Sequence, residues 1–299
     1  MIEIKNITKT FQDVVAVDNI TLTIKEGVVM GLLGTNGAGK STLLRMMAGI
    51  LKQDSGEILI DNEYVWNCPL VKEKFFYISD DQHYFPNATP VEYASFYNSY
   101  YSNFEMDRFV DLLDKIDLPK NRKIKTFSKG MKKQLSILIG ICANTPYLFC
   151  DETFDGLDPV MRQAIKSLFI QEMERRTFTP IIASHNLREL EDICDHIGLL
   201  HKGGVLLSQE LEDLRCNLTK IQCVLPEELD EKIKNTLIVL KMQRRGKLLS
   251  MTVRGESQKV ISWIQSLNPI YCEAIPLTLE EIFISETEVV GYDIKTLIS

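Results

Sequence analysis

The 299-residue chain lacks the features by which a protein crosses or enters a membrane. No apolar stretch reaches the roughly 18 residues that a spanning helix needs, so the chain is not expected to span a membrane by itself. The first ten residues, MIEIKNITKT, have no apolar core after their first charges and are not typical of a secretory signal. We therefore expect a cytoplasmic protein.

Paired cysteines, internal repeats and an excess of basic residues are also missing. The seven cysteines are odd in number and include no CxxC pair, which is typical of buried small apolar residues in a reduced, cytosolic protein. Lysine and arginine number 34 against 41 acidic residues, and the formal charge of −7 argues against general nucleic-acid binding. With 45% hydrophobic residues, the chain can bury a sizeable core.

What the chain does contain is an alternation of short apolar runs with helical periodicity. Residues 28–33, 147–150 and 180–183 form continuous apolar runs, which are typical of strands buried on both faces of a parallel sheet. The first 30 residues alternate as strands do. The pattern predicts an α/β fold with a mostly parallel core sheet. Helical patterns occupy residues 41–50, 91–101, 106–116, 131–143 and 159–176.

The character of the chain changes after about residue 210. Residues 219–286 indicate a small α+β module that contains a hairpin turning near Arg245 and Gly246. We therefore predict two domains, residues 1–215 and 216–299. The elements expected in the second are strands 221–225, 237–242, 248–253 and 271–275 and helices 226–235, 260–267 and one from Thr278.

A glycine-rich loop follows the first buried run and opens a helix. Residues 34–41 match GxxxxGK[ST], with glycines that let successive N–H groups point inward as an anion nest at a helix N-terminus. Lys40 would reach the β- and γ-phosphates of a nucleoside triphosphate, and the Ser41 hydroxyl would bind Mg²⁺. The alternative is an ordinary glycine-rich turn, but the lysine, the hydroxyl and both flanking elements favour nucleotide binding. The expected nucleotide-binding residues are Gly34, Thr35, Asn36, Gly37, Ala38, Gly39, Lys40, Ser41 and Thr42.

Two adjacent carboxylates follow the buried run 147–150. Asp151 could hold Mg²⁺ and Glu152 could orient or deprotonate the attacking water. Paired acids at a strand end can also be turn or capping residues, so the pair alone is a weak signal.

The surrounding segments resemble a known family. FSKGMKKQ at 127–134, FDGLDP at 154–159 and Ser184-His185 follow the phosphate loop in the order found in the ATP-binding cassette family, the nucleotide-binding subunits of ABC transporters. The resemblance covers about residues 1–215. It implies a P-loop NTPase cassette with an antiparallel β subdomain and a helical subdomain at about 84–145. The segment LTLEEIF at 277–283 is similar to the end of bacterial export-type ABC ATPases.

The resemblance also assigns roles to residues. Asp151 and Glu152 resemble the metal carboxylate and the catalytic base, and His185 resembles the switch histidine that contacts the γ-phosphate. Asp158 resembles the aspartate that contacts the opposite subunit. Ser128, Gly130 and Met131 resemble the signature loop, which in the family closes over the γ-phosphate of ATP held by that subunit.

Phe11 stands 29 residues before Lys40 and resembles the aromatic residue that stacks on the adenine ring. The stacking supports ATP without strictly excluding GTP. The alternative is an aromatic at the edge of a strand that belongs to the core.

Two positions depart from the family pattern. Lys129 stands where the signature loop commonly has a glycine, and it would strain the loop only if its φ were positive. Asp80 stands where the family places a glutamine, with Gln82 two residues later. A carboxylate at that place could still meet Mg²⁺ through a water molecule.

Aromatic residues are concentrated in one segment. Residues 75–104 hold 11 of the 25 aromatics of the chain, and those from Tyr93 to Phe104 follow helical spacing as one apolar stripe. Such a stripe is usually a core face. The family, however, carries here the groove that receives a coupling helix of the membrane subunit. We therefore expect some of Tyr84, Phe85 and the Tyr93–Tyr101 set to be exposed.

The sequence thus favours an ATP-hydrolysing subunit that uses ATP and Mg²⁺ to power transport, more in keeping with export than import. The expected partners are a separate integral-membrane permease, which would hold the chain at the inner face of the cell membrane, and a second ATPase subunit in a homodimer or heterodimer. Two alternatives stay open: a soluble cassette ATPase acting on ribosomes or nucleic acid, and a regulatory subunit with low turnover. The sequence does not identify the transported substrate or the role of residues 219–286.

Overall fold

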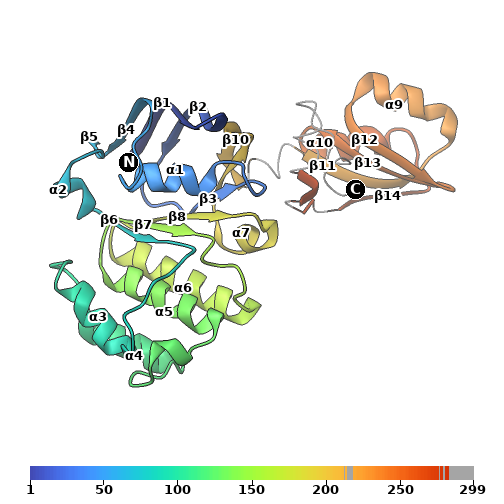
Figure 1. Cartoon of the computed structure of the whole chain (residues 1–299). Helices are drawn as coiled ribbons and strands as arrows, with labels where there is room; N and C mark the ends of the chain where they lie inside the picture. The colour runs from blue at the N-terminus through green and yellow to red at the C-terminus, as the bar shows by residue number, and fades with distance from the viewer. Residues whose placement is uncertain (212, 214–217, 276, 279, 283–299) are drawn as a thin grey trace. The chain divides into compact units, whose positions relative to one another are not determined.

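The computed structural model describes residues 1–211, 213, 218–275, 277–278 and 280–282 (Figure 1). The chain divides into two compact units, Met1–Ser208 and Gln209–Ser299.

A six-stranded sheet forms the centre of the first unit, with the strand order β10-β9-β3-β8-β7-β6. The strands β9, β3, β8, β7 and β6 pair in parallel. Every residue of β3, β7 and β8 is buried, because helices and a second sheet cover both faces. The predicted α/β fold with a mostly parallel sheet is therefore confirmed. The bounds are β3 Met30–Leu33, β6 Phe75–Ile78, β7 Tyr147–Asp151, β8 Thr179–Ser184, β9 His196–His201 and β10 Gly204–Glu210.

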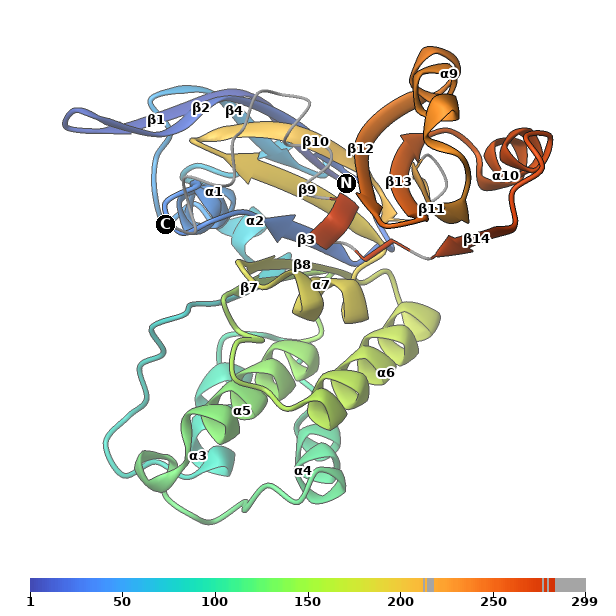
Figure 2. The ribbon, with the colours of Figure 1, turned by 90° about the vertical axis from the view of Figure 1, so that its right-hand side faces the viewer.

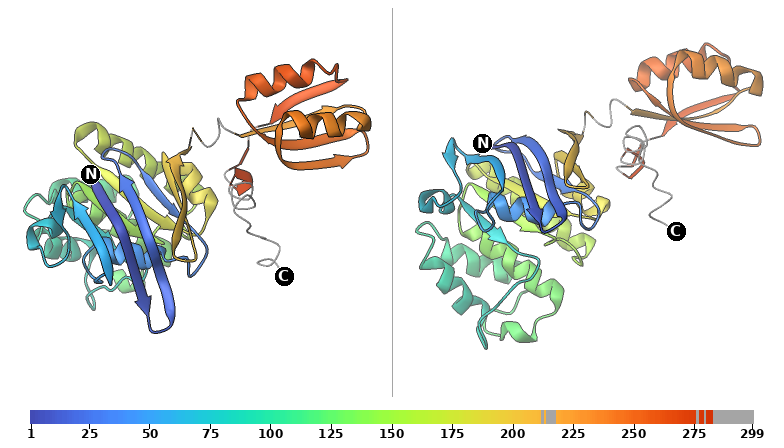
Figure 3. Two further views of the ribbon diagram at one scale, coloured as in Figure 1. Left: turned by 90° about the horizontal axis from the view of Figure 1, so that it is seen from above. Right: turned by 45° about the horizontal axis from the view of Figure 1, so that its top comes forward.

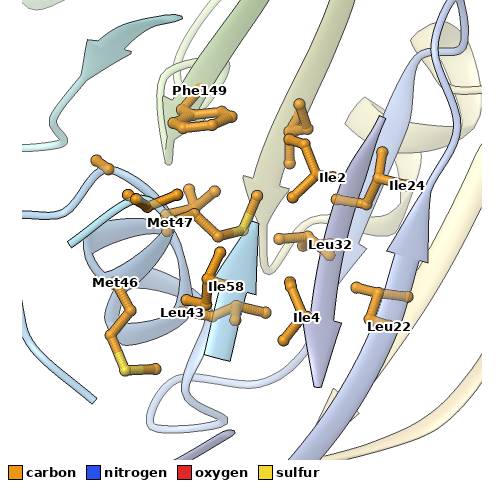
Figure 4. Close-up of a cluster of buried hydrophobic side chains, with 14 of the residues drawn as sticks. Ile2, Ile4, Leu22, Ile24, Leu32, Leu43, Met46, Met47, Ile58 and Phe149 are labelled. Atoms are coloured by element: carbon orange, nitrogen blue, oxygen red, sulfur yellow. The ribbon is translucent and has the colours of Figure 1, made fainter. Parts of the chain in front are cut away.

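A second, antiparallel sheet with the order β2-β1-β4-β5 covers one side of helix α1, Lys40–Met47. Its strands are β1 Ile2–Phe11, β2 Val14–Ile24, β4 Ser55–Ile60 and β5 Glu63–Tyr64. Figure 4 shows side chains from both sheets and from α1 gathered into one cluster, among them Ile4, Leu32, Leu43 and Phe149. This core fixes α1 directly behind the end of β3.

Helices lie on the opposite side of the parallel sheet, away from β1 and β2 (Figures 1 and 2). Thr89 caps the first with a reciprocal pair of hydrogen bonds to Glu92. That helix ends at Asn98, so Tyr100 and Tyr101, which we expected in it, lie in the turn that follows. The bounds are α3 Pro90–Asn98, α4 Met106–Lys115, α5 Lys129–Cys142 and α6 Pro159–Arg175, with the short elements α2 Pro69–Lys72, η1 Ile124–Thr126 and α7 Leu187–Ile193.

The second unit has the chain order strand, helix, two strands, helix, strand. Its antiparallel sheet has the order β12-β13-β11-β14, and both helices pack on one face of it (Figure 3). Gly246, with φ 60°, makes the hairpin turn between β12 and β13. The helix expected from Thr278 lies mostly outside the described residues. The bounds are β11 Leu218–Val224, η2 Glu227–Leu229, α9 Asp230–Thr236, β12 Ile238–Arg245, β13 Leu248–Arg254, α10 Ser257–Gln265 and β14 Tyr271–Ile275.

Three further features concern the cysteines, the length of the helices and the tryptophans. Four of the six described cysteines are buried, and all six carry free thiols. No helix in the described part of the chain is long and apolar enough to cross a membrane. The two tryptophans of the chain are divided between the units, with Trp66 before α2 and Trp263 on α10, both half-buried.

Candidate nucleotide-binding and hydrolysis site

The phosphate loop connects β3 to α1 and has a backbone that only small residues permit. Gly39 has φ 100°, and a Cβ there would lie 2.4 Å from the carbonyl oxygen of Ala16. A Cβ on Gly34 would lie 2.6 Å from the carbonyl oxygen of Leu200. Larger side chains would therefore push the loop away from its neighbours. This packing therefore requires glycine at positions 34 and 39, whereas Gly37 has open space around it and a φ of 82° that favours glycine.

The ammonium of Lys40 is buried at the start of α1. It donates to the carbonyl oxygens of Gly34 at 2.7 Å and Thr35 at 3.2 Å. The loop is therefore wrapped around the ammonium group. Its third neighbour is the carboxylate of Glu152, whose Oε1 lies 3.3 Å away. The lysine can therefore exchange one anion, the Glu152 carboxylate, for another, a phosphate oxygen.

Ser41 and Asp151 bring two oxygen ligands together from different elements. Ser41 Oγ on α1 donates to Asp151 Oδ1 at the end of β7 at 2.7 Å. Asp151 is completely buried, and burial raises its pKa, while the hydrogen bonds from Ser41 and Tyr77 lower it. No group of three or more His, Cys, Asp or Glu side chains forms a metal site among the described residues. A hydroxyl and one carboxylate fit Mg²⁺, which takes most of its ligands from water and phosphates.

Tyr77 is a site residue that sequence reasoning missed. Its hydroxyl donates to Asp151 Oδ2 at 3.2 Å, because β6 pairs with β7 in a register that sets Tyr77 opposite Phe149. Burial raises the pKa of Tyr77, and the charge of Asp151 raises it further. The available signal was a single hydroxyl within the otherwise apolar run of β6.

Glu152 presents its carboxylate between two basic side chains. Its Oε2 lies 2.9 Å from Nδ1 of His185, and its Oε1 faces Lys40. Its φ is 48°, a left-handed conformation that is uncommon for a residue other than glycine. Just after His185, Asn186 caps α7 by accepting a hydrogen bond from the N–H of Arg188 at 3.1 Å. The cap fixes the loop that carries the histidine.

A cavity of about 540 Å³ is lined by the phosphate loop, the carboxylates of Asp80, Glu152 and Asp155, and the end of β1. Phe11 lines it with an exposed ring, so this aromatic does not belong to the core. Asp80 also lines it, whereas Gln82 lines a different cavity next to Tyr93 and Ser136. The predicted residues that line the 540 Å³ cavity are Phe11, Asn36, Gly37, Ala38, Gly39, Lys40, Ser41, Thr42, Asp80, Glu152 and His185.

Other predicted residues lie outside this cavity. Gly34 and Thr35 contribute the carbonyls that bind Lys40, and Asp151 lies behind Ser41. The remaining four lie at two helix N-termini. Ser128 caps α5 by accepting from the N–H of Met131 at 3.1 Å, with Gly130 in the first turn, and Asp158 caps α6 by accepting from the N–H of Met161 at 2.9 Å.

Lys129 does not strain the signature segment. It is the first residue of α5 and is not among the residues with positive φ. Its ammonium lies 3.5 Å from the carboxylate of Asp155, and both residues line the cavity. Lysine is therefore tolerated at this position.

Several aromatic side chains near α3 are exposed, which confirms that expectation. Phe85, Phe96 and Tyr100 are 48%, 38% and 70% exposed, and the ring of Phe96 lies within 5 Å of the other two, centroid to centroid. Tyr93 of the same stripe is buried and donates to the carbonyl oxygen of His83 at 2.9 Å. The stripe is thus divided between core and surface.

The chain is similar to known sequences and solved structures over most of its length. The family model described as ABC transporter matches residues 17–155. The Bacillus subtilis (strain 168) ABC transporter ATP-binding protein YtrB is 28% identical, over 96% of this chain and 98% of YtrB. The Uncharacterized ABC transporter ATP-binding protein YcbN of the same strain is 32% identical, over 76% of each chain. A solved structure described as the ATP binding subunit of an ABC transporter is 26% identical, with a TM-score of 0.66 over 72% of this chain and 92% of that one.

In the parallel sheet, strand β3 opens into a phosphate loop, an Asp-Glu pair stands at the end of β7, and a histidine follows β8. This arrangement defines a P-loop ATPase of the cassette type. The chain belongs to the family of ABC transporter ATP-binding proteins, whose cassettes bind and hydrolyse ATP. The resemblance predicted from the motifs is confirmed.

Proposed function

We propose that this protein binds ATP together with Mg²⁺ and couples its hydrolysis to transport of a substrate through a separate membrane permease. The observation that carries the proposal is the convergence of Lys40, Glu152 and His185 on one cavity, with Ser41 joined to Asp151 behind it. Each of these residues has the chemistry that one part of phosphoryl transfer needs.

The loop N–H groups and Lys40 bind the β- and γ-phosphates and position the terminal phosphate. Ser41 and Asp151 would hold Mg²⁺, which would supply positive charge to offset that of the phosphates. Glu152 accepts the proton of the attacking water, since its carboxylate, only 15% exposed, lines the cavity and is oriented by His185. Asp80 supplies a further carboxylate at the cavity wall, suited to contact with Mg²⁺ through water. Phe11 offers its exposed ring to the adenine.

The second nucleotide contact comes from another subunit. Ser128, Gly130 and Met131 lie at the N-terminus of α5, where unpaired N–H groups and the helix dipole favour an anion. Ser128 and Asp158 are exposed and lie outside the cavity of their own chain. We therefore infer a homodimer, or a heterodimer with a related ATPase subunit, in which these residues close over ATP bound by the partner.

The membrane partner docks on the aromatic surface formed by Phe85, Phe96 and Tyr100. Exposed aromatic side chains that contact one another are the usual anchors of a protein interface. This contact would hold the chain at the inner face of the membrane. Export is the proposed direction, supported by the similarity of segment 277–283 to export-type ATPases. No nucleic acid is part of the proposal.

Replacement of the base tests the function. Glu152→Gln keeps the shape of the side chain but removes its ability to accept a proton, so ATP turnover should fall by about 10²-fold or more while ATP binding persists. Turnover is measured by phosphate release, and ATP-dependent dimer formation by light scattering. Glu174→Gln on the exposed face of α6 is the matched control and should turn over ATP normally.

Full turnover in Glu152→Gln would disprove the assignment of the base. A wild-type chain that binds ATP but does not hydrolyse it, even with its permease, would instead support a regulatory subunit.

A further inference from the structure

Lys133 is a buried charge that the steps above do not use. It lies on α5, one helical turn after Lys129, and its side chain is only 3% exposed. Burial lowers its pKa, which reflects the cost of keeping an ammonium away from water. A buried lysine persists where its donors are well satisfied, so its contacts are informative.

The ammonium of Lys133 binds the main chain of Glu152. Its Nζ donates to the Glu152 carbonyl oxygen at 2.7 Å, and the carboxylate of Asp155 lies 3.8 Å from the same nitrogen. The N–H of Glu152 donates to the carbonyl oxygen of Ala183 at 3.0 Å. Both polar main-chain groups of Glu152 are therefore held, one by β8 and the other by α5.

This support acts at a strained point of the backbone. Glu152 has φ 48°, which is unfavourable for a residue with a Cβ, and such a conformation persists only where the surroundings enforce it. A charge-assisted hydrogen bond inside a buried site is a strong restraint. If the carbonyl of Glu152 rotated, its carboxylate would leave the position between Lys40 and His185.

We propose that Lys133 is a positioning residue for ATP hydrolysis, which holds the left-handed main chain of Glu152 so that the carboxylate faces the attacking water. The proposal rests on the function proposed above. It adds a physical connection: α5 begins at the segment 128–131 and carries Lys133 one turn later, so the same helix meets the partner's nucleotide and holds the base. Lys129 and Asp155 reinforce the connection, since Asp155 lies near both lysines.

Substitution of Lys133 gives the first test. Lys133→Met keeps an unbranched apolar stem, one atom shorter, but cannot donate a hydrogen bond, so kcat should fall by about tenfold to a hundredfold while the KM for ATP changes less than about twofold. Lys132→Met is the matched control on the same helix, because Lys132 points to the ring of Tyr84, 5.9 Å from its centroid, rather than to Glu152. It should retain the wild-type kcat. Unchanged kcat in Lys133→Met would overturn the proposal.

A double substitution separates positioning from general loss of structure. If Lys133 acts through Glu152, Lys133→Met should lower turnover no further when Glu152 is already Gln. Additive losses would mean that Lys133 acts elsewhere and would overturn the proposal. If Lys133→Met does not fold, Lys133→Gln serves instead. Its shorter neutral amide should lower kcat at least threefold without raising KM, and unchanged kcat would again count against the proposal.

The two proposals fail in different ways. Absence of turnover in the wild-type chain with its permease, or full turnover in Glu152→Gln, would refute the proposed function. Normal turnover in Lys133→Met, with Glu152→Gln inactive, would refute only the positioning role.

Discussion

Glu152 is restrained at four of its atoms by residues from four parts of the first unit. His185 and Lys40 face its two carboxylate oxygens, while Lys133 and Ala183 bind its main-chain carbonyl and N–H. Because the carboxylate is half-buried between two basic side chains, its direction is set before any substrate contact. Preorganisation of this kind is what proton transfer from a bound water requires.

The neighbouring carboxylate offers a prediction at the same scale. Tyr77→Phe removes only the hydroxyl that donates to Asp151 Oδ2. Because groups that hold a metal ligand in place commonly change affinity by about 10- to 100-fold when removed, the Mg²⁺ concentration for half-maximal ATPase should rise, by at least several-fold. Maximal turnover in excess Mg²⁺ should change little.

Mg²⁺ titration of the ATPase rate checks this expectation. Tyr64→Phe is the matched control, because its exposed hydroxyl bonds to Glu57 and lies outside the site. An identical Mg²⁺ dependence in Tyr77→Phe and wild type would show that the hydroxyl does not orient Asp151.

Residue patterns predict part of the site and miss the rest for physical reasons. The loop 34–41 is contiguous, so its function can be read from local sequence, and Asp151 and Glu152 follow a recognisable buried strand. The contacts of Glu152 with Lys133 and His185 depend on the pairing of β7 with β8 and on a left-handed φ. Neither is encoded in a short motif, so Lys133 and Tyr77 emerge only from the folded structure.

At the scale of elements, a helix or strand could be predicted when its apolar residues form a clear run or a clear periodic stripe. The strands β3, β7 and β8 are buried on both faces and therefore appear as uninterrupted apolar runs. Strand β9 was missed, and it contains Gly198, where a Cβ would lie 2.8 Å from Met30 Cε. Helix α7 was also missed, since it has seven residues and depends on the Asn186 cap rather than on a long periodic stripe.

The stability of the helical segment around α3 and α5 should depend on pH. Burial raises the pKa of both Tyr84 and Tyr101 to about 12, and Tyr84 is hydrogen-bonded to Ser136 at 2.8 Å. In the unfolded chain the phenols ionise near pH 10. Their contribution to stability is therefore complete below about pH 10 and is lost as the pH rises towards 12.

Urea unfolding at pH 9 and pH 11 tests this sign. The wild type should lose stability across the interval, by on the order of 1 kcal/mol for each tyrosine, because pH 11 lies about one unit above the pKa of the unfolded phenol and still below that of the folded one. Tyr84→Phe should be less stable than wild type at pH 9, yet lose less between the two pH values because one ionising group is gone. An equal loss in both proteins would contradict the assigned pKa of Tyr84.

At the scale of the whole molecule, the chain joins two units with separate cores. The first is centred on α1 between two sheets, and the second on the cluster that contains Ile221, Leu249 and Ile264. The proposed ATP site draws all of its residues from the first. Ligand binding should therefore act on the stability of one unit only.

Calorimetry provides the measurement. The intact chain should unfold in two transitions, and ATP with Mg²⁺ should raise the midpoint of only one. At free ATP about 100 times the Kd, the gain is about 2.7 kcal/mol for the unit that binds. Lys40→Ala should abolish the shift, whereas Lys247→Ala, in the hairpin turn of the second unit, should leave it unchanged. A single transition that moves as a whole would mean that the units unfold together.

The division of the two tryptophans gives the chain a built-in optical reporter. Trp66 belongs to the first unit and Trp263 to the second, and each is half-buried. The wavelength of its fluorescence maximum therefore shifts when unfolding exposes the indole to water. The ammonium of Lys52 lies 5.9 Å from the ring centroid of Trp66. With Phe at either position, the remaining fluorescence comes from one unit alone. Two indoles so distributed let a fluorimeter follow each half of the molecule separately, without any attached dye.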